Sequence, residues 1–168
     1  TGPIPERRSV HLMLQVCGAL AEAHARGIVH RDVKPENLFL CAAGGIPDFV
    51  KVIDFGIARR SDTEEGGTIT NLEQVIGTPA YLSPEVALGR QADARSDVYG
   101  LGGVLYFLLT GAPPFGGTPD RELMAAHVEK QLVPASVRLG TPIDHRLEAI
   151  VARCLAKAPA DRYADFGE

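Results

Sequence analysis

The sequence predicts a mainly α-helical domain with one small β-hairpin. Four segments place apolar residues at helical spacing, at residues 9–26, 96–110, 119–132 and 143–158. Two short apolar runs, residues 37–41 and 49–53, flank a turn that contains Gly44 and Gly45. With 168 residues and no internal repeat, the chain can bury one core without a disulfide or metal to stabilise it.

The first two helices are expected to form the centre of the domain. Ser9 can cap the first, whose apolar residues recur at Leu12, Val16 and Leu20. The segment 96–110 is apolar on most faces, which predicts a buried helix capped by Ser96 or Asp97.

The later helices are expected at the surface. Residues 119–132 and 143–158 are amphipathic, and a last helix is expected to begin near Asp161. Residues 61–71 are polar and lack periodicity, which predicts a mobile loop.

Composition excludes several classes of protein. The 17 basic and 21 acidic residues give a net charge of −4, which argues against a nucleic-acid partner. The most apolar stretch, residues 101–109, is too short for a membrane segment. Three widely spaced cysteines indicate a reducing compartment. Four histidines lack metal-ligand spacing and are expected to lie at the surface or between helices: His11, His24, His127 and His145.

A group of oxygen-bearing side chains lies at the two ends of the hairpin. Asp32 and Asn37 precede its first strand, and Asp54 follows its second. A single aspartate in a loop is usually a turn former, but pairing of the strands would bring these three together. Two oxygen ligands that leave positions open for phosphates are typical of a magnesium site.

These motifs resemble those of a known enzyme family. The run HRDVKPEN at residues 30–37 and DFG at 54–56 are similar to signatures of the eukaryotic-like serine/threonine protein kinases that many bacteria carry. GTPAYLSPE at 77–85 resembles the segment that ends in APE, with serine in place of alanine, and SDVYGLG at 96–102 resembles the start of the central helix. The resemblance covers the larger, C-terminal lobe of the kinase fold, which is an α+β fold.

The resemblance implies a role for each polar residue of the motifs. Asp32 would accept the proton of the substrate hydroxyl, and Lys34 would add positive charge near the transferred phosphoryl group. Asn37 and Asp54 would hold Mg²⁺, or Mn²⁺, on the phosphates of ATP. Thr78 would hydrogen-bond Asp32 and Lys34, which is typical of serine/threonine kinases.

Other matches imply structural roles. Phe39 would form the floor of the adenine site, and His30 would pack with Phe55 beneath the metal-binding aspartate, next to Gly56. Asp97 would brace the backbone of His30 and Arg31, in addition to or in place of a plain helix cap.

Further matches concern the activation segment. Glu85 and Arg162 would form a buried ion pair that anchors its end. Thr70, and after it Thr68, would be phosphorylated and pair with Arg31, although either threonine can equally be an ordinary loop hydroxyl.

The family's N-terminal lobe has no counterpart in the sequence. No G-x-G-x-x-G is present, and no lysine precedes Lys34. We therefore expect residues 1–168 to be the C-terminal lobe alone, truncated at its C-terminal end and inactive in isolation. The surface around Leu38, Phe39 and Phe55 is expected to be an exposed apolar patch.

The sequence favours an enzyme that acts on protein substrates in the cytoplasm, either free or as the cytoplasmic part of a membrane-anchored parent. The main alternative is a non-catalytic pseudokinase or scaffold module, which would not require Asp32, Asn37 and Asp54 together. A small-molecule phosphotransferase of the aminoglycoside kind shares the Asp-to-Asn spacing but lacks the segment 56–85.

Overall fold

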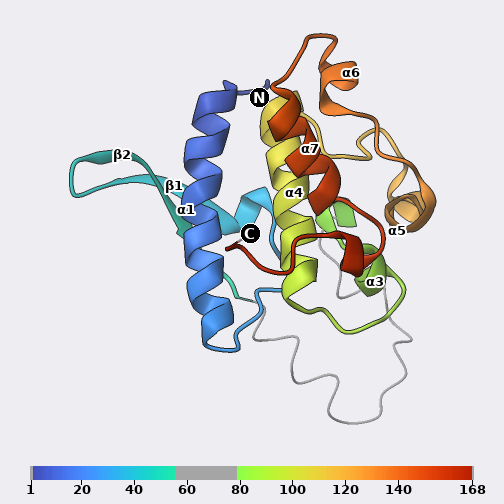
Figure 1. Ribbon diagram of the computed structural model, residues 1–168, viewed down its shortest axis with the longest axis horizontal. Helices are drawn as coiled ribbons and strands as arrows, with labels where there is room; N and C mark the ends of the chain where they lie inside the picture. The colour runs from blue at the N-terminus through green and yellow to red at the C-terminus, as the bar shows by residue number, and fades with distance from the viewer. Residues whose placement is uncertain (1, 56–78, 168) are drawn as a thin grey trace.

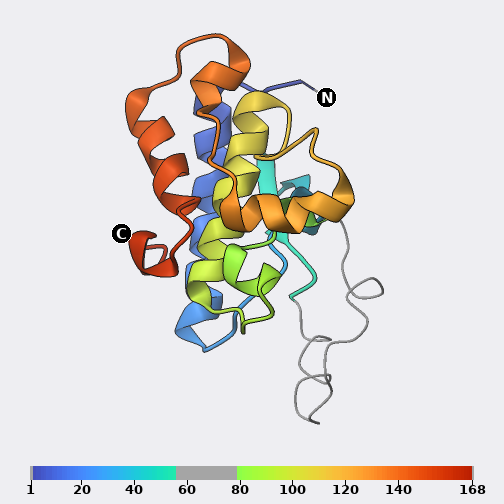
Figure 2. The same ribbon diagram turned by 90° about the vertical axis from the view of Figure 1, so that its right-hand side faces the viewer.

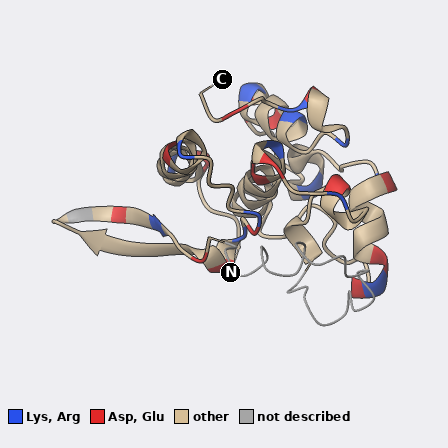
Figure 3. Cartoon of the chain, turned by 90° about the horizontal axis from the view of Figure 1, so that it is seen from below, with Lys and Arg blue, Asp and Glu red and all other residues tan. Residues whose placement is uncertain are grey.

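Two antiparallel helices form the centre of the molecule. The computed structural model describes residues 2–55 and 79–167. Helices α1 (Glu6–Ala25) and α4 (Ala94–Thr110) lie side by side, and α7 (His145–Cys154) packs against α4 (Figure 1). The hairpin projects from the body beyond α1, as Figure 3 shows from below. The mainly α-helical architecture with one hairpin agrees with the sequence prediction.

Helix α1 begins earlier than the sequence predicted. Pro5 is its N-cap and Glu6 its first residue. Ser9 is not the cap: it lies inside the helix, fully buried, and its hydroxyl donates to the Pro5 carbonyl at 3.3 Å. The Pro5 φ of −55° suits a helix start, and no side chain caps the first turn.

Helix α4 is capped by Asp93 and not by Ser96 or Asp97. The Asp93 carboxylate accepts from the backbone N–H groups of Arg95 and Ser96, and the Ser96 hydroxyl accepts from the Asp93 N–H, which forms a capping box. This cap leaves the Asp97 side chain free for contacts outside the helix. Gly111, with a left-handed φ of 77°, ends α4.

The hairpin pairs β1 (Leu38–Ala43) with β2 (Ile46–Val52). The strands are antiparallel, with Leu38 opposite Val52 and Phe39 opposite Lys51. Gly44 and Gly45 form the turn with positive φ values of 58° and 79°. A short 3₁₀ turn, η1 (Pro35–Asn37), leads directly into β1, so the strand starts where the polar motif ends.

The C-terminal half differs from the prediction in detail. The helix expected at 119–132 is α5 (Asp120–Glu129), which runs across the direction of α4 (Figure 2). The described part of this half also contains η3 (Pro79–Tyr81), α3 (Pro84–Ala87) and α6 (Ala135–Leu139), which the sequence did not predict. The predicted loop at 61–71 lies outside the described residues.

The chain after α7 also departs from the prediction. In place of a helix from Asp161, it forms a 3₁₀ turn, η4 (Pro159–Asp161), and Arg162 is extended. No helix in the described ranges is both long and apolar enough to span a bilayer.

Arg162 accounts for this departure because its side chain is directed inward. It is fully buried, and each of its five N–H groups can be matched to an acceptor. Two bonds of 2.8 and 2.9 Å reach the Glu85 carboxylate, and the others reach the carbonyls of Arg95, Ala156 and Lys157. One ion pair therefore connects α3, α4 and the segment after α7.

The Glu85 carboxyl remains ionised in this environment. Burial acts to raise its pKa, but hydrogen bonds from Arg162 and from the Ser96 hydroxyl outweigh burial and lower the pKa to about 2. Since the unfolded value is near 4.5, the unfolded chain binds the proton more tightly. The pair therefore stabilises the fold fully above about pH 4.5, and the stabilisation is lost as the pH falls toward 2.

We expect Glu85→Ala to lower the free energy of unfolding by roughly 3–5 kcal/mol, because Arg162 would remain buried without its counter-charge. Glu85→Gln should weaken the dependence of stability on pH below 4.5. Urea unfolding of the full-length protein at pH 7 and pH 4 measures both effects, with the exposed Glu122→Ala as the control. A Glu85→Ala variant as stable as the Glu122→Ala control would contradict this role of the pair.

Candidate active site

Three residues of the polar motif meet in one loop, which we call the site loop (residues 30–37). The Asn37 side-chain N–H₂ donates to the Asp32 carbonyl at 2.7 Å and to Asp32 Oδ2 at 3.2 Å. Lys34 Nζ lies 2.8 Å from the same Oδ2. The side chains of Asp32 and Lys34 are partly exposed, whereas Asn37 is buried. Asn37 thus fixes the loop from inside, and the two charged groups face solvent.

The hairpin brings the backbone just before Asp54 next to the end of the site loop. The Ile53 N–H donates to the Asn37 carbonyl at 2.9 Å, which extends the strand pairing beyond Val52. The Ile53 carbonyl accepts from His30 Nε2 at 3.0 Å. Asp54 follows directly, with a left-handed φ of 55° that is uncommon for a residue other than glycine. The chain therefore turns away from β2 at Asp54, next to Asn37 at the end of the site loop.

His30 packs against this junction and hydrogen-bonds to both of its sides. It is fully buried, and its ring lies 4.6 Å from that of Phe55, measured between centroids. Its Nδ1 accepts from the Asp32 N–H at 3.3 Å, so Nε2 carries the proton that is donated to Ile53. The imidazole thus connects the backbone next to Asp32 with the backbone next to Asp54.

A buried carboxylate on α4 holds the start of the site loop. Asp97 is 1% exposed, and its two oxygens accept from the backbone N–H groups of His30 at 2.8 Å and Arg31 at 2.7 Å. Arg31 has a left-handed φ of 69°, a conformation that is costly for arginine and that these bonds compensate. Asp97 thus holds the backbone of both residues at the start of the site loop.

His24 is a further partner of this carboxylate that the sequence analysis missed. Its Nε2 lies 2.7 Å from Asp97 Oδ2. We had expected His24 to be an ordinary packing residue. Its position eight residues after the buried Val16, and four after the buried Leu20, places it on the inner face of α1 and was the available signal.

The apolar surroundings agree only in part with the prediction. Phe39 is 60% exposed and its neighbour Leu40 45%. Leu38 and Phe55 were expected to be exposed too, but both are half-buried and pack against the core, Phe55 with its ring beside that of His30. Four predicted site residues lie outside the described ranges: Gly56, Thr68, Thr70 and Thr78.

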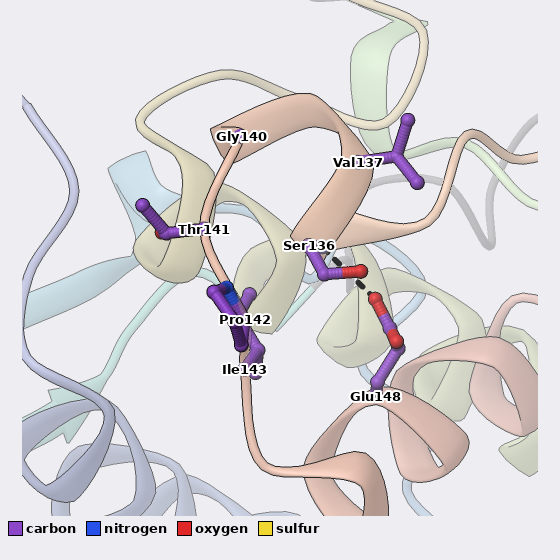
Figure 4. A pocket seen from close by; sticks show the side chains of 7 residues that line it. All are labelled: Ser136, Val137, Gly140, Thr141, Pro142, Ile143 and Glu148. Carbon is purple, nitrogen blue, oxygen red and sulfur yellow. Dashed lines mark hydrogen bonds between the residues drawn. The ribbon is translucent and has the colours of Figure 1, made fainter.

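Outside this arrangement, a candidate site in the described residues would be a metal-ligand cluster or a cavity. Residues 2–55 and 79–167 contain no group of three or more His, Cys, Asp and Glu able to hold a metal. A shallow cavity of about 420 Å³ is lined by residues 136–148, between α6 and the start of α7 (Figure 4). There Glu148 accepts from the Ser136 N–H at 2.9 Å, which ties α6 to α7. None of the predicted site residues lines this cavity.

We expect Asp97→Asn to loosen the site loop, because an amide has one acceptor oxygen where the carboxylate has two. Amide hydrogen exchange at His30 and Arg31 should accelerate, and the free energy of unfolding should fall by about 1–3 kcal/mol. Asp93→Asn at the cap of the same helix is the matched control and should be nearly neutral, because asparagine caps equally well. Unchanged exchange at both amides in Asp97→Asn would refute the contact.

Comparison with known proteins identifies the family. The protein kinase domain family matches residues 1–165. The serine/threonine-protein kinase PknB of Mycobacterium tuberculosis H37Rv is 45% identical over 168 residues, which is 99% of this chain and 26% of that protein. Pkn1 of Myxococcus xanthus is 45% identical over 166 residues, covering 98% of this chain and 23% of that protein. The chain thus spans about a quarter of the length of these relatives.

The fold has a counterpart among solved structures. The crystal structure of Rad53 1-466 in complex with AMP-PNP matches with a TM-score of 0.75 and 24% identity, over 98% of this chain and 39% of that chain. This match supports the kinase-like fold, and the match to residues 1–165 covers nearly the whole sequence. The chain belongs to the protein kinase domain family.

Proposed function

We propose that the protein containing this chain transfers the γ-phosphate of ATP to serine or threonine hydroxyls of proteins. The observation that carries this proposal is the convergence of Lys34 and Asn37 on Asp32 at the base of the hairpin that leads to Asp54. The relatives named above are serine/threonine-protein kinases, in agreement with this chemistry.

In this proposal Asp32 accepts the proton of the substrate hydroxyl. Its Oδ2 is held by Lys34 and Asn37, which fixes the direction of the carboxylate, and we assign its other oxygen to the hydroxyl. The Lys34 ammonium lies 2.8 Å from Asp32 and would stabilise the charge on the transferred phosphoryl group. Thr78 would bind both side chains.

The protein kinase family generally uses ATP and Mg²⁺, and the residues present fit such an ion. The Asn37 N–H₂ group points to Asp32, so its amide oxygen is turned away and can act as a ligand. Asp54 would supply carboxylate oxygen, and these hard donors suit Mg²⁺ or Mn²⁺. When bound, the ion would neutralise charge on the phosphates of ATP.

We further propose that residues 1–168 act as the C-terminal lobe of a two-lobed catalytic domain. The sequence contains no glycine-rich phosphate loop, and the exposed Phe39 offers an aromatic face on which an adenine could rest once a second lobe covers it. Positioning supplies most of the catalysis in phosphoryl transfer, so this chain alone should be inactive.

Regulation by phosphorylation of Thr70 or Thr68 belongs to the same proposal. Arg31 Nε is buried and has no hydrogen-bond partner among the described residues. A phosphothreonine could provide an acceptor for its guanidinium. We place this lobe in the cytoplasm, where ATP is available, either free or attached to a membrane-anchored parent. Protein substrates and the second lobe are the proposed partners, and nucleic acid is not expected.

The full-length protein should phosphorylate a serine- or threonine-containing protein with ATP and Mg²⁺, and Asp32→Asn should lower kcat by about 10²- to 10⁴-fold because the base is lost. Phosphate incorporation measures this. Asp120→Asn, at the exposed start of α5, is the matched control and should retain activity. The isolated 168-residue chain should show no turnover.

Three outcomes would contradict parts of this proposal. Binding of ATP and Mg²⁺ by the full-length protein without transfer would favour the scaffold alternative, and transfer only to small molecules would favour a phosphotransferase of the aminoglycoside kind. Turnover by the isolated chain that Asp32→Asn abolishes would contradict the need for a second lobe.

A further inference from the structure

His127 is a buried imidazole that the proposed chemistry does not use. It lies on α5, is fully buried, and its Nδ1 is 2.8 Å from the Tyr99 hydroxyl on α4. The rings of Tyr99 and Phe115 approach it edge-on, with centroids 5.7 and 4.8 Å away. Lys157 Nζ donates to the His127 carbonyl at 2.7 Å. Tyr99 and Phe115 therefore fix the side chain, and Lys157 fixes the backbone of the same residue.

The other edge of the imidazole faces η3. The backbone of Pro79 and Ala80 lies next to it, and Nε2 is completely buried without a hydrogen bond of good geometry. Burial and the charge of Lys157 lower the pKa of His127 to about 4, so the ring is neutral at pH 7. Pro79 has no N–H and offers only a carbonyl. The Tyr99 hydroxyl therefore donates to Nδ1, and Nε2 carries the proton that faces the η3 carbonyls.

The η3 segment extends from this contact to the site loop. Ala80 packs in an apolar cluster with Phe115, Leu123 and Ala126. Tyr81 lies close to Glu36: burial raises the pKa of the Tyr81 hydroxyl, and the charge of Glu36 raises it further. Glu36 belongs to the site loop, between Asp32 and Asn37. One side of η3 therefore packs against α5, and Tyr81 on the other side lies close to Glu36 of the site loop.

We infer that His127 is a positioning residue for a polypeptide substrate, because its buried ring fixes the packing of α5 against η3, and η3 runs toward the site loop, where that substrate must present a hydroxyl to Asp32. This inference rests on the proposed function. It assigns to His127 an effect on the binding of the protein substrate and none on the binding of ATP, because its contacts are to η3, α4 and α5 and not to Asn37, Phe39 or Asp54.

Two substitutions test the roles of the two imidazole nitrogens separately. Asparagine places a polar group near the position of Nδ1, and glutamine places one near that of Nε2. In the full-length kinase, His127→Asn should raise KM for a peptide substrate by about fivefold or more, with KM for ATP within about twofold of wild type. His127→Gln should restore the peptide KM to within about twofold, because its amide can donate to η3.

A matched pair on α4 provides the control. Tyr99→Phe removes the hydroxyl that orients His127, whereas Tyr106→Phe removes a hydroxyl that donates to the Val133 carbonyl at 3.0 Å, away from η3. Thermal unfolding should show similar losses for both, but only Tyr99→Phe should raise the peptide KM.

Other outcomes would overturn the inference. The first is a peptide KM that is the same for His127→Asn and wild type. The second is an equal rise of the peptide KM in His127→Asn and His127→Gln. The third is an equal rise of the peptide KM in Tyr99→Phe and Tyr106→Phe. A wild-type protein that binds ATP but phosphorylates no peptide would instead overturn the proposed function, and the inference with it, so the two failures are distinguishable.

Discussion

The Asp97 carboxylate is the contact on which the candidate site depends. It is buried at the start of the central helix and accepts hydrogen bonds from two consecutive backbone N–H groups, those of His30 and Arg31. Such charge-assisted bonds are stronger than bonds between neutral groups, and here they compensate the left-handed backbone of Arg31. The direction in which the chain leaves Arg31 determines where Asp32 points, so the buried central helix positions the group proposed to do the chemistry.

The central helix has a second role at its first turn. Ser96, next to Asp97, donates to Glu85, whose partner Arg162 accounts for the extended chain after α7. The helix thus connects the site loop with the anchor of the segment that ends at Glu85. Tyr99, one turn further on, is packed under the Arg162 guanidinium at 4.8 Å and reaches His127 with its hydroxyl. Contacts from one helix therefore reach the site loop, the Glu85–Arg162 pair and η3.

Much of this arrangement could be predicted from the sequence, because the motifs retain their order and spacing. The strand pairing that brings the chain at Asp54 near Asn37 follows from the two apolar runs, whereas the pairing of Glu85 with Arg162 was implied by the resemblance to protein kinases. The start of α1, the Asp93 cap and the extended chain at Arg162 could not be predicted locally. In each case the sequence offers two alternatives. Helix α1 could begin at Pro5 or at Ser9, and α4 could be capped by Asp93 or by Ser96. The chain after α7 could continue as a helix or extend so that Arg162 pairs with Glu85.

The contributions of His24 and His127 were also beyond the sequence analysis. Both histidines lack metal-ligand spacing, and helical periodicity indicates only that a residue faces inward. Their partners, Asp97 and Tyr99, are more than 25 positions away along the chain and meet them only through helix packing. A buried polar residue on a helix face is therefore a signal that a partner exists, although the sequence does not identify it.

The most direct test of this account is an experimental structure of the full-length protein with Mn²⁺ and a non-hydrolysable ATP analogue. The account predicts that the ion is coordinated by the side-chain oxygens of Asn37 and Asp54 at about 2.0–2.3 Å. The Asp32 carboxylate should lie close enough to the terminal phosphate for a single water molecule to bridge them. An ion bound by other residues, or an Asp32 carboxylate facing away from the nucleotide, would contradict it.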